Sequence, residues 1–143
     1  MISKHRAGCQ KGHHRRHKEK PFAFFYNRFP RYEEMQCYMR MLSRQFKNFA
    51  RVETIGKSYQ GRDIDMIVIS KFRSRKERHA AFIDANIHAR EWLSNSTVLY
   101  FIDYIIRHRQ ILNLMDFYIV PCLNPDGYEY THTQVSLIAI FVT

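Results

Sequence analysis

The sequence predicts an α/β protein with a mixed, partly parallel sheet flanked by helices. Apolar residues recur at spacings of three and four between residues 32 and 49, as in an amphipathic helix. Apolar runs at 80–87 and 117–122 enclose a second helical segment. A strand, a helix and a strand of this length form a β-α-β unit, which implies two parallel strands joined by a right-handed crossover. The 143 residues are enough for one compact domain.

The first helix is expected after Pro30, because proline is favoured in the first turn of a helix. Glu33 and Glu34 follow near its positive end. Its apolar residues form one stripe that we expect to face the core: Tyr32, Met35, Tyr38, Met39, Leu42, Phe46 and Phe49.

Two strands are expected next, at 52–55 and 63–70, joined by a short loop with turn-prone glycines at Gly56 and Gly61. A basic, polar loop at 71–78 precedes the third strand. The third run, 80–87, is mostly apolar, which predicts a strand with both faces covered.

The second helix is expected to open at His88 and to end near Arg107, His108 and Arg109, which favour the negative end of a helix. Residues 111–114 then lead to the strand at 117–122. The sequence Asn124-Pro125-Asp126-Gly127 directly after this strand predicts a turn, because proline fixes φ and glycine tolerates positive φ.

The formal net charge of +10 is concentrated in the first twenty residues, which hold seven Lys or Arg and one Glu. Four of the eight histidines lie there too, and apolar residues are almost absent. We interpret residues 1–20 as a flexible basic arm. A solvated leader is the favoured interpretation, with polyanion contact or loose metal capture as alternatives. No nucleic-acid partner is firmly implied.

The sequence gives no indication of a signal peptide, a membrane-spanning segment or a cysteine framework. Charge follows Met1-Ile2-Ser3 where a signal peptide would place its apolar core, so no signal peptide is visible. No apolar run approaches the roughly twenty residues that span a bilayer. The three cysteines lack C-x-x-C spacing, so they define neither a disulfide framework nor a zinc knuckle.

His88 and Glu91 stand three positions apart where an apolar strand gives way to a helix. A kinked junction can aim both side chains at one point, whereas a continuous strand would send them to opposite faces. Strand carboxyl ends are where α/β sheets place ligand sites, and His with Glu is a common part of a catalytic zinc site. Taken alone, the pair also fits a hydrogen-bonded histidine beside a glutamate that favours the helix start.

Three short sequence motifs occur in the same order as in one enzyme family: residues 55–62, residues 87–92 and residues 124–128. Over about residues 26–134 the chain resembles the zinc metallocarboxypeptidases of the pancreatic carboxypeptidase A and B type. The resemblance implies that His88 and Glu91 bind zinc and that Arg90 helps to hold the peptide substrate. It also implies a carboxypeptidase-like fold and an extracellular enzyme that hydrolyses the carboxy-terminal peptide bond of peptides and proteins.

The family's third zinc ligand, general base and carboxylate-capturing residues are implied to lie beyond residues 124–127. We find no match for them before Thr143. We therefore expect a partial catalytic domain with an incomplete sheet at 21–134, an apolar tail unrelated to the family at 135–143, and no activity of this chain by itself.

Neither downstream histidine is expected to complete the metal site. If the second helix is continuous, His108 lies about seventeen residues beyond Glu91, or roughly 25 Å along the axis. His132 follows the predicted turn, and we interpret it as a surface histidine. Trp92 is expected to be structural, as an aromatic residue at the helix start that packs into the core.

A second interpretation is a non-catalytic protein that binds polyanions through the basic arm or a partner through its sheet. An incomplete sheet exposes an edge strand and apolar surface, so self-association is expected. The apolar tail at 135–143 adds to this expectation.

Overall fold

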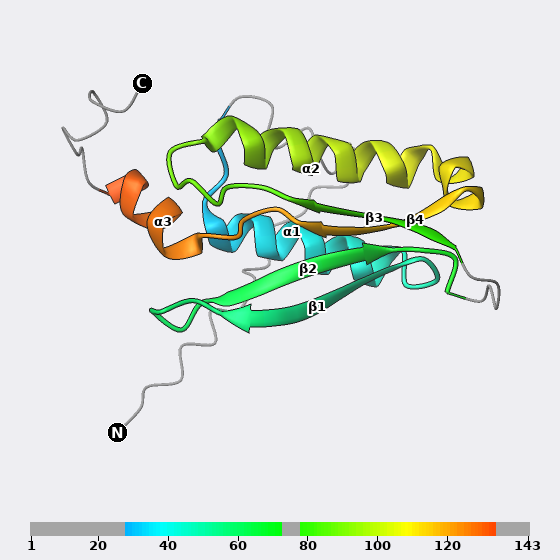
Figure 1. The fold of residues 1–143 in the computed structure, drawn as a ribbon, viewed down its shortest axis with the longest axis horizontal. Coiled ribbons are helices and arrows are strands. Elements are labelled where there is room, and N and C mark those ends of the chain that lie inside the picture. Colours follow the sequence, from blue (N-terminus) through cyan, green and yellow to red (C-terminus); the bar gives the residue numbers. More distant parts are fainter. Residues whose placement is uncertain (1–27, 73–77, 134–143) are drawn as a thin grey trace, which may run out of the picture.

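The computed structural model describes residues 28–72 and 78–133 (Figure 1). The predicted arm at 1–20 and tail at 135–143 lie outside the described residues. In chain order the elements are α1 (Tyr32–Gln45), β1 (Ala50–Lys57), β2 (Asp63–Ile69), β3 (His79–Asp84), α2 (Trp92–Arg107), the 3₁₀ helix η2 (Arg109–Asn113), β4 (Met115–Val120) and α3 (Pro125–Thr133).

The four strands form one mixed sheet in the order β1-β2-β4-β3. β2 is antiparallel to β1 and to β4, whereas β3 and β4 are parallel and connected by α2. The predicted α/β fold, its partly parallel sheet and its β-α-β unit are confirmed. Because β3 and β4 run the same way, their carboxyl ends meet at one edge of the sheet.

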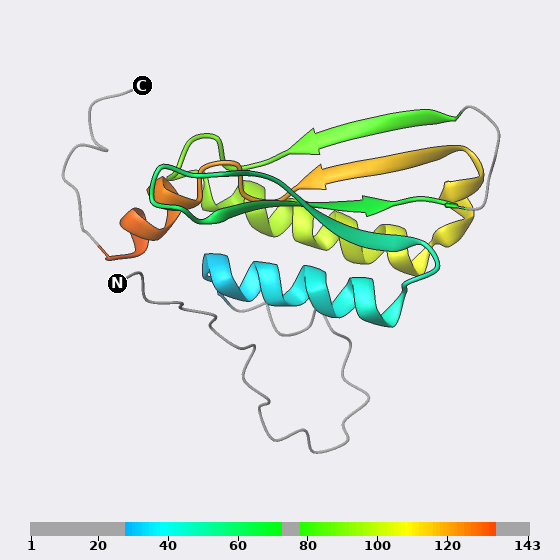
Figure 2. The same ribbon diagram turned by 90° about the horizontal axis from the view of Figure 1, so that it is seen from below.

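Helices α1 and α2 cover the same face of the sheet (Figure 2). Ile67 lies opposite Ile119, and Ile69 lies opposite Phe117, so the two central strands present paired apolar side chains to both helices. The stripe predicted for the first helix is buried at Tyr32, Met35, Tyr38, Met39 and Leu42, whereas Phe46 and Phe49 follow the helix and pack partly buried against the core.

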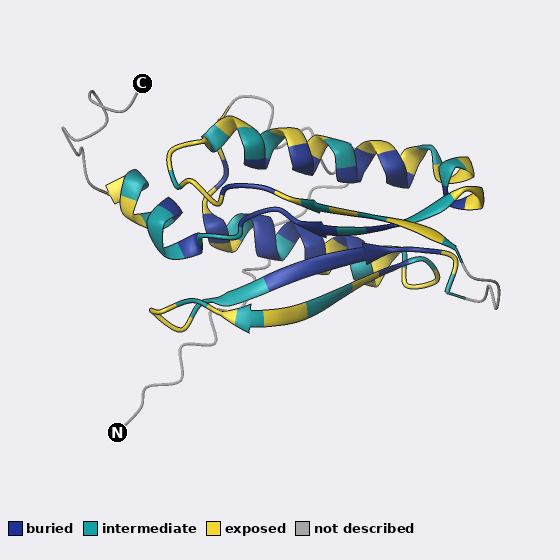
Figure 3. Ribbon diagram, in the orientation of Figure 1, coloured by how far each residue is buried: buried dark blue, intermediate teal, exposed yellow. Residues whose placement is uncertain are grey.

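The opposite face of the sheet carries a smaller cluster around Met66, Val68 and Val120, all buried. β2 is therefore covered on both faces along most of its length (Figure 3). Burial on both faces is therefore found at β2, a central strand that lies between β1 and β4.

The prediction that residues 80–87 form a strand with both faces covered is wrong. β3 is one of the two edge strands of the sheet in the described part of the chain, and its residues are exposed or only partly buried (Figure 3). Phe82 is 63% exposed. An apolar run fixes neither a strand's place in the sheet nor what covers it, and here the order of pairing puts the run at an edge.

The first helix starts after Pro30 as predicted, whereas the second starts later than the predicted position at His88. α2 begins at Trp92 with Glu91 at its N-cap, so the residues from His88 to Glu91 form a loop before the helix and not its first turn. α1 begins at Tyr32 with Arg31 at its N-cap, which places Pro30 just outside the helix.

The turn predicted at residues 124–127 is instead the start of α3, which begins at Pro125. The Asn124 side-chain oxygen accepts a hydrogen bond from the Gly127 N–H at 3.0 Å, as an N-cap residue does. Proline at the first helical position has no unpaired N–H, so Asn-Pro here starts a helix. None of the described helices is long and apolar enough to cross a bilayer.

Candidate metal centre

His88 and Glu91 meet in the loop between β3 and α2. The Nδ1 atom of His88 lies 3.1 Å from Oε1 of Glu91. The loop is a tight turn, because the Glu91 N–H donates to the His88 carbonyl at 3.1 Å. The loop follows the carboxyl end of β3, which lies beside the carboxyl end of β4. The junction therefore brings together the two side chains that a continuous strand would separate.

The separation of this pair fits a single zinc ion. A histidine nitrogen and a carboxylate oxygen bound to one tetrahedral zinc ion at about 2.0–2.1 Å lie about 3.3 Å apart. The side chains of His88 and Glu91 are 76% and 58% exposed, so a cation can reach both from solvent. Zinc binding would displace any proton on His88 Nδ1, because the ligand is the neutral imidazole nitrogen. Within residues 28–72 and 78–133, no group of three or more His, Cys, Asp and Glu side chains could hold a metal ion.

Asn86 shapes the start of this loop. It is buried and has a φ of +57°, a left-handed conformation that asparagine adopts more readily than most residues. Its side-chain Nδ2 donates to the carbonyls of His88 at 3.2 Å and Ala89 at 3.4 Å. Its own N–H donates to Ser94 Oγ at 3.1 Å. The loop is thus held from inside, although its two candidate ligands face solvent.

The segment that joins β4 to α3 supports the loop from the other side. Asn124 donates its backbone N–H to the Asn86 carbonyl at 3.1 Å and its side-chain Nδ2 to the Ile87 carbonyl at 3.2 Å. Gly127 lies so close that a Cβ built there would be 2.8 Å from Cβ of Ala89. Only glycine fits between Asn124 and Ala89 without displacing one of them.

α3 also holds the first turn of α2 through Trp92. The Trp92 indole N–H donates to Thr131 Oγ1 at 2.9 Å, and its ring stacks on His132 with centroids 4.0 Å apart. Trp92 also packs against the main core, as predicted. Burial, followed by repulsion from the Arg31 cation, lowers the pKa of His132. Its Nε2 is buried and has no hydrogen-bond partner within the described residues, so the prediction of a simple surface histidine is wrong.

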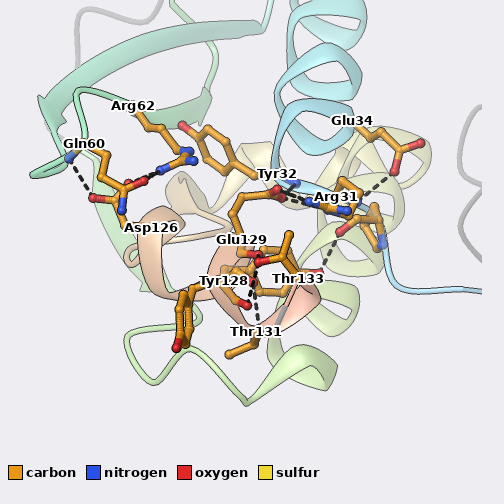
Figure 4. A network of polar contacts seen from close by, with 12 residues as sticks. Arg31, Tyr32, Glu34, Gln60, Arg62, Asp126, Tyr128, Glu129, Thr131 and Thr133 are labelled. Atoms are coloured by element: carbon orange, nitrogen blue, oxygen red, sulfur yellow. Dashed lines mark hydrogen bonds and ion pairs between the residues drawn. The ribbon is translucent and has the colours of Figure 1, made fainter. Parts of the chain in front are cut away.

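Asp126, in the first turn of α3, accepts hydrogen bonds from the loop between β1 and β2 (Figure 4). The donors are Ser58 Oγ at 2.8 Å, the Gln60 N–H at 2.8 Å and Arg62 Nη1 at 2.6 Å. Burial opposes ionisation of Asp126, but these three donors outweigh it and hold its pKa below the ordinary value. The loop reaches this position through Gly61, whose φ is +79°.

Glu129, one turn further along α3, binds the start of α1 (Figure 4). Its carboxylate accepts from the Tyr32 N–H at 2.9 Å and forms an ion pair with Arg31. Burial alone would raise the pKa of Glu129, but Arg31 and the Tyr32 N–H together lower it. Tyr128 adds a buried hydrogen bond from its hydroxyl to the Pro30 carbonyl at 2.6 Å. α3 is therefore attached to α1, α2 and the β1–β2 loop.

The predicted site residues are distributed as follows. His88 and Glu91 come together, and Arg90 is exposed in the same loop. His108 caps the far end of α2, where its Nδ1 lies 2.9 Å from the Tyr104 carbonyl oxygen, so it takes no part in the site. Sequence reasoning missed the role of Asn86, and it named Gly127 only as a turn residue without its close packing against Ala89. In the sequence, each of these two residues is only an Asn or a Gly near the end of a strand. Such residues are common in loops, so they do not indicate a special role.

The fold and this loop define an α/β protein with a histidine–glutamate pair at the carboxyl end of a parallel strand. The zinc carboxypeptidase family matches residues 35–139. The chain therefore belongs to the zinc carboxypeptidase family, a family of peptidases.

The chain is 36% identical over 107 residues to carboxypeptidase B of Astacus astacus, a match that covers 72% of this chain and 35% of the relative. It is 32% identical over 122 residues to a protein of Saccharomyces cerevisiae named as an inactive metallocarboxypeptidase, covering 79% and 28%. The crystal structure of carboxypeptidase A from Helicoverpa armigera superposes with a TM-score of 0.70 at 30% identity, covering 73% and 27%. The chain thus spans about a third of the length of the curated relatives it matches.

Proposed function

We propose that His88 and Glu91 hold a zinc ion that serves hydrolysis of the carboxy-terminal peptide bond of peptides and proteins. The observation that supports this most directly is the 3.1 Å separation of His88 Nδ1 and Glu91 Oε1, in a chain that belongs to the zinc carboxypeptidase family. A bound zinc ion supplies a Lewis acid for the peptide carbonyl and an activated water. The chain's own part is to present the two ligands from a loop fixed by Asn86 and Asn124.

Arg90 is proposed to contact the peptide substrate. It lies between the two ligands in sequence, and it is exposed at the same sheet edge. A guanidinium offers a planar set of donors that suits carbonyl and carboxylate oxygens. Replacing it with lysine would keep the charge but lose this geometry.

We also infer that this chain does not hydrolyse peptides by itself. Two protein ligands are fewer than the three that catalytic zinc sites use, and the described residues hold no group of three. The yeast relative that is named as inactive matches 79% of this chain, so the sequence pattern found here does not by itself require activity.

The test uses the purified 143-residue chain with zinc and peptides that end in aromatic, aliphatic or basic residues. We expect no turnover, and weak zinc binding that His88→Ala and Glu91→Gln each remove. His108→Ala is the matched control, because His108 lies at the far end of α2 and should leave zinc binding unchanged. Turnover by the chain that disappears in His88→Ala would refute the proposed inactivity. Zinc binding that neither ligand variant changes in a chain without residues 1–20, which hold four histidines of their own, would refute the proposed site.

The proposed site of action is extracellular, as the resemblance to pancreatic carboxypeptidases implies. Expressing the complete transcript with a carboxy-terminal tag and assaying cells and medium tests this. Tagged protein recovered only from cells would contradict it.

A second candidate function is partner binding without catalysis. The first twenty residues carry seven basic residues against one acidic residue, which suits a polyanion. Retention on a heparin column that falls with salt and is lost on deletion of residues 1–20 would favour this function. No retention at low salt would count against it.

A further inference from the structure

We propose that Asn86 is a positioning residue that holds the His88 and Glu91 side chains at one point. The inference rests on the proposed function of these two residues as zinc ligands and deepens it. Both candidate ligands are exposed, at 76% and 58%, so their own side chains have little packing to fix them. Asn86 is 2% exposed and lies two residues before His88. The order of the loop therefore has to come from a buried residue such as this one.

The backbone of Asn86 turns the chain out of the sheet. The preceding residue, Ala85, still follows the sheet pattern, since its N–H donates to the Val120 carbonyl at 3.0 Å. Asn86 has a φ of +57°, and the loop begins there. Few residues other than glycine and asparagine adopt this conformation readily. Glycine would allow the same turn, so the backbone alone does not explain the asparagine.

The side-chain amide supplies what glycine lacks. Its Nδ2 donates to the carbonyls of His88 and Ala89, at 3.2 Å and 3.4 Å. These carbonyls belong to the first two residues of the turn that carries the ligands. The amide thus fixes the peptide planes on the carboxyl side of His88, and with them the direction in which its side chain leaves the loop.

The orientation of the amide is itself determined by its neighbours. Its Oδ1 accepts a hydrogen bond from Cys122 Sγ at 3.4 Å. Burial raises the pKa of the Cys122 thiol to about 12, so the thiol keeps its proton and acts as a donor at neutral pH. A flipped amide would place its oxygen against the two carbonyl oxygens of His88 and Ala89. Only one orientation satisfies every contact.

The remaining polar groups of Asn86 tie the loop to two further segments. Its N–H donates to Ser94 Oγ in the first turn of α2, and its carbonyl accepts from the Asn124 N–H just before α3, both at 3.1 Å. This one buried residue therefore connects three segments: α2, the β4–α3 junction and the metal loop, which is the loop from Ile87 to Glu91 that carries the candidate ligands.

Two variants separate the backbone role from the side-chain role. Asn86→Gly keeps access to positive φ and removes the amide, whereas Asn86→Asp keeps the shape but turns a carboxylate oxygen toward the two loop carbonyls. Asn113→Gly, at an exposed position, is the matched control for an asparagine-to-glycine change. Cys122→Ala removes the donor to Oδ1 together with a small part of the core and leaves the Asn86 amide in place. It serves as the milder variant should Asn86→Gly fail to fold.

The experiment titrates the full chain with Zn²⁺ and follows the imidazole signals of His88 by NMR, with a urea unfolding curve for each variant. We expect Asn86→Gly and Asn86→Asp to raise the zinc dissociation constant about tenfold or more, the range seen when residues that orient metal ligands are changed. Cys122→Ala should raise it a few-fold, and Asn113→Gly should leave it within about twofold. Folded Asn86→Gly protein that binds zinc like the wild type would overturn the inference.

A second readout on the metal-free chain separates this inference from the proposed function. The wild type should show a nuclear Overhauser contact between the His88 ring and the Glu91 side chain and slow amide exchange at Glu91. Asn86→Gly should lose both. If the wild type binds no zinc at His88, the proposed function fails. The role of Asn86 is then judged by this readout alone, and unchanged contact and exchange in Asn86→Gly would overturn it.

Discussion

The backbone N–H of Tyr32 donates a hydrogen bond of 2.9 Å to the carboxylate of Glu129, 97 positions further along the chain. Tyr32 is the first residue of α1, and the first N–H groups of a helix have no partner within the helix. Glu129 supplies that partner from α3 and adds an ion pair with Arg31. One carboxylate therefore joins the first helix of the described chain to the last.

Replacing this carboxylate is expected to weaken the whole domain. Glu129→Ala should lower the free energy of unfolding by about 1–2 kcal/mol, because it removes a helix cap and leaves the Tyr32 N–H without its acceptor. Urea unfolding followed by circular dichroism measures the change. Glu33→Ala, an exposed acid in the first turn of α1, is the control and should cost no more than about 0.5 kcal/mol. Equal losses in both variants would contradict the role given to Glu129.

Acid should weaken the attachment of α3 to the β1–β2 loop. The pKa of Asp126 is lowered in the folded chain, so its ionised form stabilises the fold above the ordinary carboxyl pKa near 4. That contribution is lost as the pH falls through the lower folded value. The difference in unfolding free energy between the wild type and Asp126→Asn should be constant from pH 7 to 5 and shrink below about pH 4. A difference that does not change with pH would refute this.

His132 should produce a separate pH dependence at higher pH. Its folded pKa is lowered, so the unfolded chain takes up the proton first as the pH falls below about 6.5. Stability is therefore complete above that value and decreases below it. His132→Phe keeps a ring to stack on Trp92 but does not titrate. Relative to this variant, the wild type should lose stability between pH 7.5 and 5, and parallel curves would show that His132 contributes nothing.

The close approach of Gly127 to Ala89 predicts a coupled pair of substitutions. Gly127→Ala should cost about 1–3 kcal/mol, because the added Cβ would lie 2.8 Å from Cβ of Ala89 and from Asn124. Ala89→Gly in the same chain should recover part of this loss by removing one of the two contacts. A double-mutant cycle measures the coupling. Strictly additive effects would mean that the two residues do not meet.

The open edge of the sheet predicts self-association through β3. Phe82 is 63% exposed on this strand, and unpaired edge strands with apolar side chains associate with other chains. Sedimentation equilibrium should show concentration-dependent association that Phe82→Lys reduces about tenfold, or roughly 1.4 kcal/mol. Tyr59→Lys is the control, since Tyr59 is fully exposed in a loop away from that edge. Association that both variants reduce equally would point to a nonspecific charge effect.

The elements of the fold were predictable because their signals are local. The apolar stripe from Tyr32 to Leu42 arises from spacing within one segment, and this spacing follows directly from helix geometry. The exposure of β3 was not predictable, because it depends on which strands pair with β4. A turn was expected at Asn124, but a helix starts there because the Asn124 side-chain oxygen accepts a hydrogen bond from the Gly127 N–H.

The candidate ligands were predictable from sequence, but their support was not. His88 and Glu91 are residue types that bind zinc, and three positions at a junction can converge. Nothing in the local sequence around Asn86 distinguishes it from an ordinary loop asparagine. Its importance comes from Cys122 and Asn124, residues far along the chain that the β-α-β crossover brings beside it.

The loop with the candidate ligands is supported by Asn124 and Gly127, which are synthesised well after it. A ribosome delivers β3, α2 and the His88 turn well before it delivers α3, so the nascent loop first exists without half of its contacts. Only after residues near 133 leave the exit tunnel can Glu129 reach Arg31 and Gly127 settle against Ala89. The loop that carries the candidate zinc ligands is therefore among the last parts of the described chain to complete its contacts.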